Sequence, residues 1–118
     1  MVLEDHVYTN IRKLYTAAKV ARDMLEEAAR LSDIDCVPVS VKHLVIAVAD
    51  TVTDYLLLKG DKSLTLEECE ELERLLDEVQ VANDRLLHAA TVDAIADSID
   101  RVIRALEKVL EYLGPRRP

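Results

Sequence analysis

VDAIADSIDRVIRALEKVLEYL, residues 92–113, repeats apolar side chains at the spacing of an amphipathic helix. Val, Ile, Ala and Leu recur at positions 92, 95, 96, 99, 102, 103, 106, 109, 110 and 113. Because steps of three and four residues return to the same side of an α-helix, these side chains form one apolar face. Asp97 and Arg101 form an i,i+4 pair on the opposite side. The segment predicts a helix that Gly114–Pro115 ends, and its apolar face needs other helices to cover it.

The preceding segment, residues 65–90, has the clearest helix start in the chain. Thr65 and Glu68 have the spacing of a capping box, in which each side chain binds the backbone N–H of the other. An inward stripe then follows at Cys69, Leu72, Leu76, Val79 and Leu86. No Gly or Pro interrupts residues 65–113, so one long helix is also compatible with the sequence. We favour a break near Thr91, whose hydroxyl suits the N-cap of a new helix.

Two further helices are predicted in the N-terminal half, at residues 4–31 and 40–59. In the first, apolar side chains alternate in steps of four and three at positions 7, 11, 14, 18, 21, 25 and 28. Pro38 and the acidic residues before it end this helix. The second begins at Ser40 as a plausible N-cap, is apolar around more than half of its circumference, and stops at Gly60.

These four segments predict an all-α protein, an antiparallel four-helix bundle with helices at about 4–31, 40–59, 65–90 and 92–113. The 118 residues have the size of a single domain, 1–118, in which 115–118 form a short basic tail. The sequence has no Phe and no Trp, so Leu, Val, Ile and Ala must build the core.

The charge of the chain limits its partners. The formal net charge is −8, and residues 61–80 alone carry eight Asp or Glu. A protein that holds nucleic acid by neutralising phosphates needs a basic surface, so nucleic acid is an unlikely partner. Residues 4–31 are more balanced, which leaves a local basic strip open. Its basic residues are Arg12, Lys13, Lys19, Arg22 and Arg30.

The sequence predicts a cytoplasmic protein. The N-terminus has no basic region followed by an apolar run, as a signal peptide would have. The longest apolar stretch, residues 43–58, is too short and too polar to span a membrane. Cys36 and Cys69 are expected to be buried small hydrophobes, with a disulfide between them as the alternative. One Gln, two Asn and many Glu, Arg, Leu and Val residues resemble the composition of thermophile proteins.

Several well-known sites are excluded by simple counts. Two glycines far apart cannot form a Gly-rich phosphate loop, and the sequence has no H-E-x-x-H. The Glu-x-x-His pairs of carboxylate di-iron bundles are also missing. We therefore expect no metal and no cofactor.

On the second predicted helix, His43, Asp50 and Asp54 lie on one side, because seven and eleven residues are close to whole numbers of turns. This line could hold a metal or a small ligand. Alternatively, it is the exposed edge of an otherwise apolar helix.

VANDRLLHAA, residues 81–90, is the one place where Asn, Asp, Arg and His come together on a predicted helix. Asn83 falls on the inward stripe, where it needs a hydrogen-bond partner, and we associate it with the bend at Thr91. Asp84 and His88 have i,i+4 spacing, at which a carboxylate can orient an imidazole, and Arg85 is also next to His88. The cluster is either a candidate site of Asp84, Arg85 and His88, or a structural Asn beside a surface Asp–His pair.

The order of these features resembles the HEPN superfamily of small helical-bundle proteins, over roughly residues 14–113. The similar segments are an Ala-rich first helix (TAAKVARDMLEEAARL), a second helix ending in Leu and Lys-Gly (AVADTVTDYLLLKGDKSL), a helix with Arg and His (NDRLLH) and an amphipathic last helix (AIADSIDRVIRALEKVLEYL). The resemblance implies a bundle that dimerises. In catalytic members, an Arg and a His separated by four to six residues cleave RNA without metal across the dimer interface, whereas other members are binding modules.

Two residues separate Arg85 from His88, so the catalytic spacing is not matched. We therefore expect a non-enzymatic interaction module that forms a homodimer and has a protein partner. The apolar stripes of the second and fourth helices are wide enough to cover both a core and a partner. The first alternative is a HEPN-like metal-independent ribonuclease using Arg85 and His88. The second is a small-ligand or metal binder using His43, Asp50 and Asp54.

Overall fold

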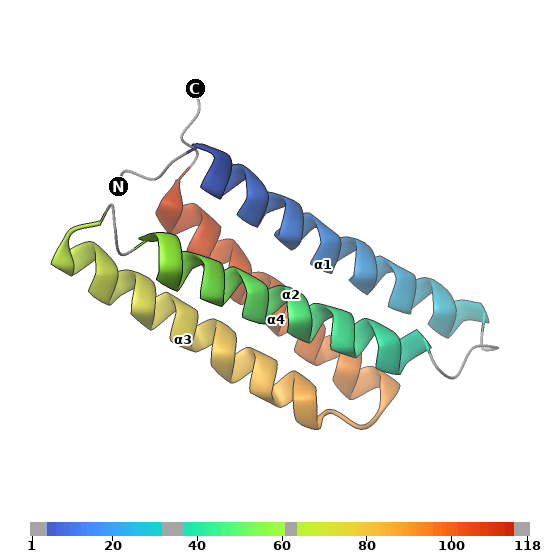
Figure 1. Ribbon diagram of the computed structural model, residues 1–118. Coiled ribbons are helices and arrows are strands. Elements are labelled where there is room, and N and C mark those ends of the chain that lie inside the picture. The colour runs from blue at the N-terminus through green and yellow to red at the C-terminus, as the bar shows by residue number, and fades with distance from the viewer. Residues whose placement is uncertain (1–4, 32–36, 61–63, 115–118) are drawn as a thin grey trace.

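The computed structural model describes residues 5–31, 37–60 and 64–114, and it confirms the all-α four-helix bundle (Figure 1). The helices are α1 (Asp5–Leu31), α2 (Val37–Gly60), α3 (Leu66–His88) and α4 (Val92–Leu113). Each helix runs antiparallel to the one before it, as Figure 1 shows. No strand occurs in the described residues, and none of their helices is long and apolar enough to cross a membrane.

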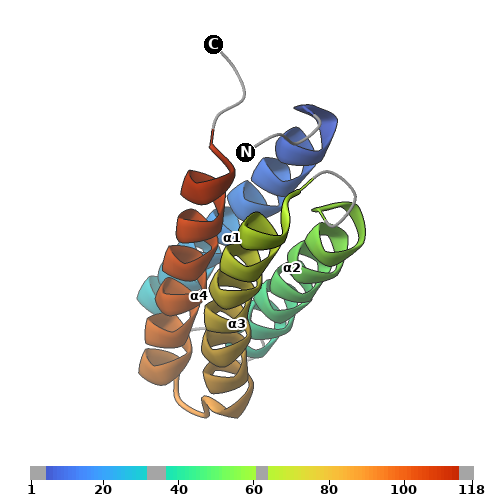
Figure 2. The same cartoon turned by 90° about the vertical axis from the view of Figure 1, so that its left-hand side faces the viewer.

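Each helix packs against its neighbours in the chain, and α1 closes the bundle against α4. Figure 2 shows α3 and α4 side by side, with α1 and α2 on the other side of the bundle. Among the described residues, α2 and α4 also meet across the diagonal, whereas α1 and α3 do not. The core is aliphatic, as the composition predicts. Its largest fully buried side chains include Ile11, Leu25, Leu56, Leu86, Ile99, Leu106 and Leu113.

The start of α2 differs from the prediction. The helix begins at Val37, three residues before Ser40, so Ser40 lies inside the helix and is not its N-cap. Pro38 therefore belongs to the first turn, where its missing N–H has no helical partner to lose and its fixed φ suits the helix. Cys69 is half-buried, whereas the sequence predicted it buried. Cys36 lies outside the described residues, and a disulfide between the two stays an alternative.

The caps of the last two helices follow the sequence closely. Thr65 and Glu68 form both hydrogen bonds of the capping box at the start of α3. The helix is interrupted between His88 and Val92. Thr91 Oγ1 accepts a hydrogen bond of 3.1 Å from the backbone N–H of Ala94. Residues 65–113 are therefore two helices.

Removal of the second cap gives a first test of the fold. Thr91→Ala is expected to lower the free energy of unfolding by about 1 kcal/mol, because the N–H of Ala94 loses its acceptor. Thr91→Ser, which keeps a hydroxyl at the same place, should stay within a few tenths of a kcal/mol of the wild type. Urea unfolding followed by circular dichroism measures both variants. Equal losses in the two would show that the hydroxyl does not cap α4.

Candidate functional site

Asn83 is buried in the structure, as its place on the inward stripe predicts, with 5% of its surface exposed. Its Nδ2 donates to Asp50 Oδ1 over 3.0 Å and to the carbonyl oxygen of Ile46 over 3.4 Å. Both partners lie on α2, so Asn83 joins α3 to α2 and is not tied to the bend at Thr91. Because both partners only accept, the orientation of the amide is fixed. Its Oδ1 is then buried with no hydrogen-bond partner in the described part of the chain.

The three candidate residues of α2, His43, Asp50 and Asp54, are all exposed. The structure brings Asp50 to Asn83, which gives this carboxylate a structural role that the sequence did not reveal. Within residues 5–31, 37–60 and 64–114, no group of three His, Cys, Asp or Glu side chains comes together as a metal site. The metal-binding alternative therefore has no ligand set of that size in these segments.

Asp84 and His88 form the surface pair that their spacing predicts. His88 Nδ1 lies 2.9 Å from the backbone oxygen of Asp84 and 3.9 Å from its carboxylate Oδ1. A carbonyl oxygen can only accept, so Nδ1 carries the proton and Nε2 is the free acceptor. The side chains are 74% and 72% exposed, so water screens the attraction between them. The imidazole therefore lies on open surface.

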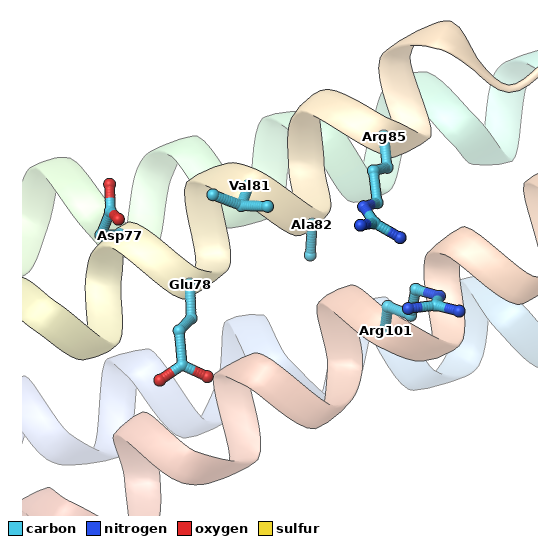
Figure 3. A pocket seen from close by; sticks show the side chains of 6 residues that line it. All are labelled: Asp77, Glu78, Val81, Ala82, Arg85 and Arg101. Atoms are coloured by element: carbon cyan, nitrogen blue, oxygen red, sulfur yellow. The ribbon is translucent and has the colours of Figure 1, made fainter.

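Arg85 lines a groove of about 270 Å³ between α3 and α4 (Figure 3). The groove has a basic end and an acidic end. In Figure 3, Arg85 and Arg101 lie toward one end, Asp77 and Glu78 toward the other, and Val81 and Ala82 between them. His88 is not among the lining residues, so the groove does not unite Arg85 with His88.

Two charges of this groove lack a partner among the residues that the structure describes. Arg101 Nε is 3.1 Å from Asp97, and Glu78 is held by Arg74 at 3.0 Å and by Lys108 at 3.1 Å. Among the described residues, neither Asp77 nor Arg85 forms an ion pair or a side-chain hydrogen bond. The groove therefore presents one unpaired acid and one unpaired base.

Sequence reasoning selected Arg85 but missed Asp77, Glu78 and Arg101. Asp77 could have been found, because it lies four residues before Val81 just as Arg85 lies four after it. Arg101 could not, because its place beside Arg85 depends on how α4 packs against α3.

The chain matches no family model, no curated protein and no solved structure, so these residues carry the argument for function.

Proposed function

We propose that this protein is a non-enzymatic interaction module that forms a homodimer through the α3–α4 groove. The observation that carries the proposal is a pair of opposite charges, Asp77 and Arg85, which lie on either side of Val81 and have no partner within residues 5–31, 37–60 and 64–114. The resemblance to the HEPN superfamily, which implies a bundle that dimerises, agrees with it.

The spacing prevents Asp77 and Arg85 from pairing with each other. They are eight positions apart, which corresponds to about 12 Å along a helix axis. Since each is four residues from Val81, all three lie on the same side of α3. Val81, between the two charges, is 52% exposed and so offers an apolar contact to a second molecule. Since no described residue pairs with either charge, a second molecule could pair with both at once.

A second copy of the chain has the complementary pattern. If a two-fold axis passes beside Val81, the two α3 helices run antiparallel and make an isologous contact. Asp77 of each copy then faces Arg85 of the other, and the two Val81 side chains cover each other. Glu78 does not oppose this arrangement, because Arg74 and Lys108 neutralise it within its own chain.

The alternatives have less support. A ribonuclease needs the Arg and the His to act on one substrate, but Arg85 faces the groove while His88 binds the backbone of its own helix. For a site on α2, Asp50 is already engaged by Asn83.

Sedimentation velocity tests the homodimer. The wild-type chain of 13.3 kDa should sediment at about twice this mass at micromolar concentration. Asp77→Arg should raise the dimer dissociation constant at least tenfold, because two attractions become two repulsions of several tenths of a kcal/mol each. Asp23→Arg makes the same charge change on an exposed part of α1 and should leave the dimer intact. A monomeric wild type, or equal dissociation constants for wild type and Asp77→Arg, would overturn the proposal.

A further inference from the structure

A second and larger groove, of about 540 Å³, lies between α1 and α4. Arg12 and Lys19 line its α1 wall, Glu107 and Glu111 line its α4 wall, and Tyr15 and Leu110 lie between these charged groups. This volume is within the range of about 300–1,000 Å³ that is typical of small-molecule sites. The groove is distinct from the α3–α4 face of the proposed dimer.

Two contacts fix how the walls face each other. Tyr15 Oη donates to Glu107 Oε2 over 2.5 Å, and Arg22 Nε donates to Asp100 Oδ1 over 2.9 Å. The two contacts are seven residues apart on α1 and seven residues apart on α4. The two antiparallel helices therefore keep the same register from one contact to the other. Continued by three residues beyond Tyr15, this register places Arg12 across from Leu110 and beside Glu111.

The contacts of these charged groups divide them into two kinds. Glu107 is held by Tyr15, and the ammonium of Lys19 lies 5.4 Å from the centre of the Tyr15 ring. Burial and the hydrogen bond to Glu107 raise the pKa of Tyr15 to about 12, so its hydroxyl remains a donor at neutral pH. Arg12 and Glu111, in contrast, make no side-chain hydrogen bond or ion pair with any described residue. The opposite walls thus present one unpaired cation and one unpaired anion.

The residues around Arg12 make its end of the groove more favourable for an anion. Arg12 also lines a depression of about 330 Å³ with Thr9, Lys13 and Thr16, none of which is a carboxylate. The Thr16 hydroxyl already donates to the backbone oxygen of Arg12, so Arg12, Lys13 and Thr9 are the donors left for a ligand. Residues 6–22 contain four Lys or Arg and no Asp or Glu, in a chain with a net charge of −8. An anionic group is therefore favoured at Arg12, more than at other places on this acidic protein.

We infer that the α1–α4 groove binds a free α-amino acid with an apolar side chain. Its carboxylate would pair with Arg12 and its ammonium with Glu111. Its side chain would lie on the floor of the groove, where Leu110 and Tyr15 keep 6% and 9% of their surface exposed. A polyanion would be repelled by Glu107 and Glu111, and a simple cation would be repelled by Arg12 and Lys19. A small zwitterion satisfies both walls.

Isothermal titration calorimetry with L-leucine tests the charge requirement. N-acetyl-L-leucine lacks the ammonium, and L-leucinamide lacks the carboxylate. We expect L-leucine to bind and each analogue to bind at least tenfold more weakly, because each leaves one charged wall unpaired. No binding of L-leucine at millimolar concentration, or equal binding of all three compounds, would overturn the inference.

Matched variants test the residues. Arg12→Gln and Glu111→Gln should each weaken L-leucine binding at least tenfold. Arg104→Gln and Glu70→Gln remove exposed charges outside the groove and should leave the affinity unchanged. Circular dichroism checks that each variant is folded. If Arg12→Gln or Glu111→Gln binds L-leucine as tightly as the wild type, the groove does not hold the ligand in this way.

Discussion

Asn83→Asp is expected to lower the free energy of unfolding by about 3–5 kcal/mol at neutral pH, the range found when a buried charge loses its compensation. In the wild type, Asn83 Nδ2 donates to the Asp50 carboxylate over 3.0 Å. The substitution replaces this donor with a second, buried carboxylate, so an attraction becomes a repulsion between like charges. The carbonyl oxygen of Ile46 loses the additional hydrogen bond from Nδ2 as well.

The loss should depend on pH in a defined direction. Burial and the neighbouring Asp50 both raise the pKa of the new carboxyl group in the folded state above its value in the unfolded chain. The folded state therefore binds the proton more tightly, and the lost stability returns as the pH falls through the raised pKa. Once protonated, the carboxyl group can again donate to Asp50. Urea unfolding at neutral and at mildly acidic pH measures the difference between variant and wild type.

Asn83→Leu is the matched control for this experiment. Leu has a similar size and carries no charge, and it also removes the buried Oδ1 that has no partner in the described residues. The exposed Asp50 carboxylate can turn to water instead. We expect a change of no more than about 1.5 kcal/mol and no added pH dependence, because the exposed Asp50 carboxylate is hydrated instead and the substitution creates no buried charge. Equal, pH-independent losses in both variants would show that Asn83 does not contact Asp50.

The fold could be predicted from the sequence because its signals are local. The apolar spacing of α4, the capping box at Thr65 and the N-cap at Thr91 each lie within a few residues of the feature they determine. The predicted start of α2 was wrong for a related reason. Pro38 favours both the end of one helix and the first turn of the next, and the local sequence does not decide between them.

The candidate sites could be predicted only in part, because each depends on two helices. The periodicity of α3 placed Asn83 inside, but nothing in α2 or α3 indicates that Asp50 is its partner. The basic strip of α1 is visible in the sequence, whereas Glu111 stands opposite Arg12 only through the α1–α4 register. Such registers are set by how side chains of two helices interdigitate, which the period of neither helix specifies.

Charge reversal at the proposed dimer interface predicts a strong preference for mixed dimers. Asp77→Arg places two bases at each contact with Arg85, and Arg85→Asp places two acids at each contact with Asp77. The free energy of dimerisation of each variant should therefore be weaker than that of the wild type by about 2 kcal/mol, because two attractive charge pairs become repulsive. When the two variants are mixed, position 77 of the first faces position 85 of the second with opposite charge, and the reverse contact is also attractive.

The exchange of the two homodimers into two mixed dimers should accordingly be favoured by about 4 kcal/mol. This raises the equilibrium constant of the exchange about a thousandfold over the statistical value. The two variants differ in mass, so native mass spectrometry of an equimolar mixture can measure all three dimers directly. Wild type mixed with Asp23→Arg, whose substitution lies on α1, should give the statistical 1:2:1 ratio. The same ratio from the Asp77→Arg and Arg85→Asp mixture would place the interface elsewhere, because charges that do not meet cannot select their partners.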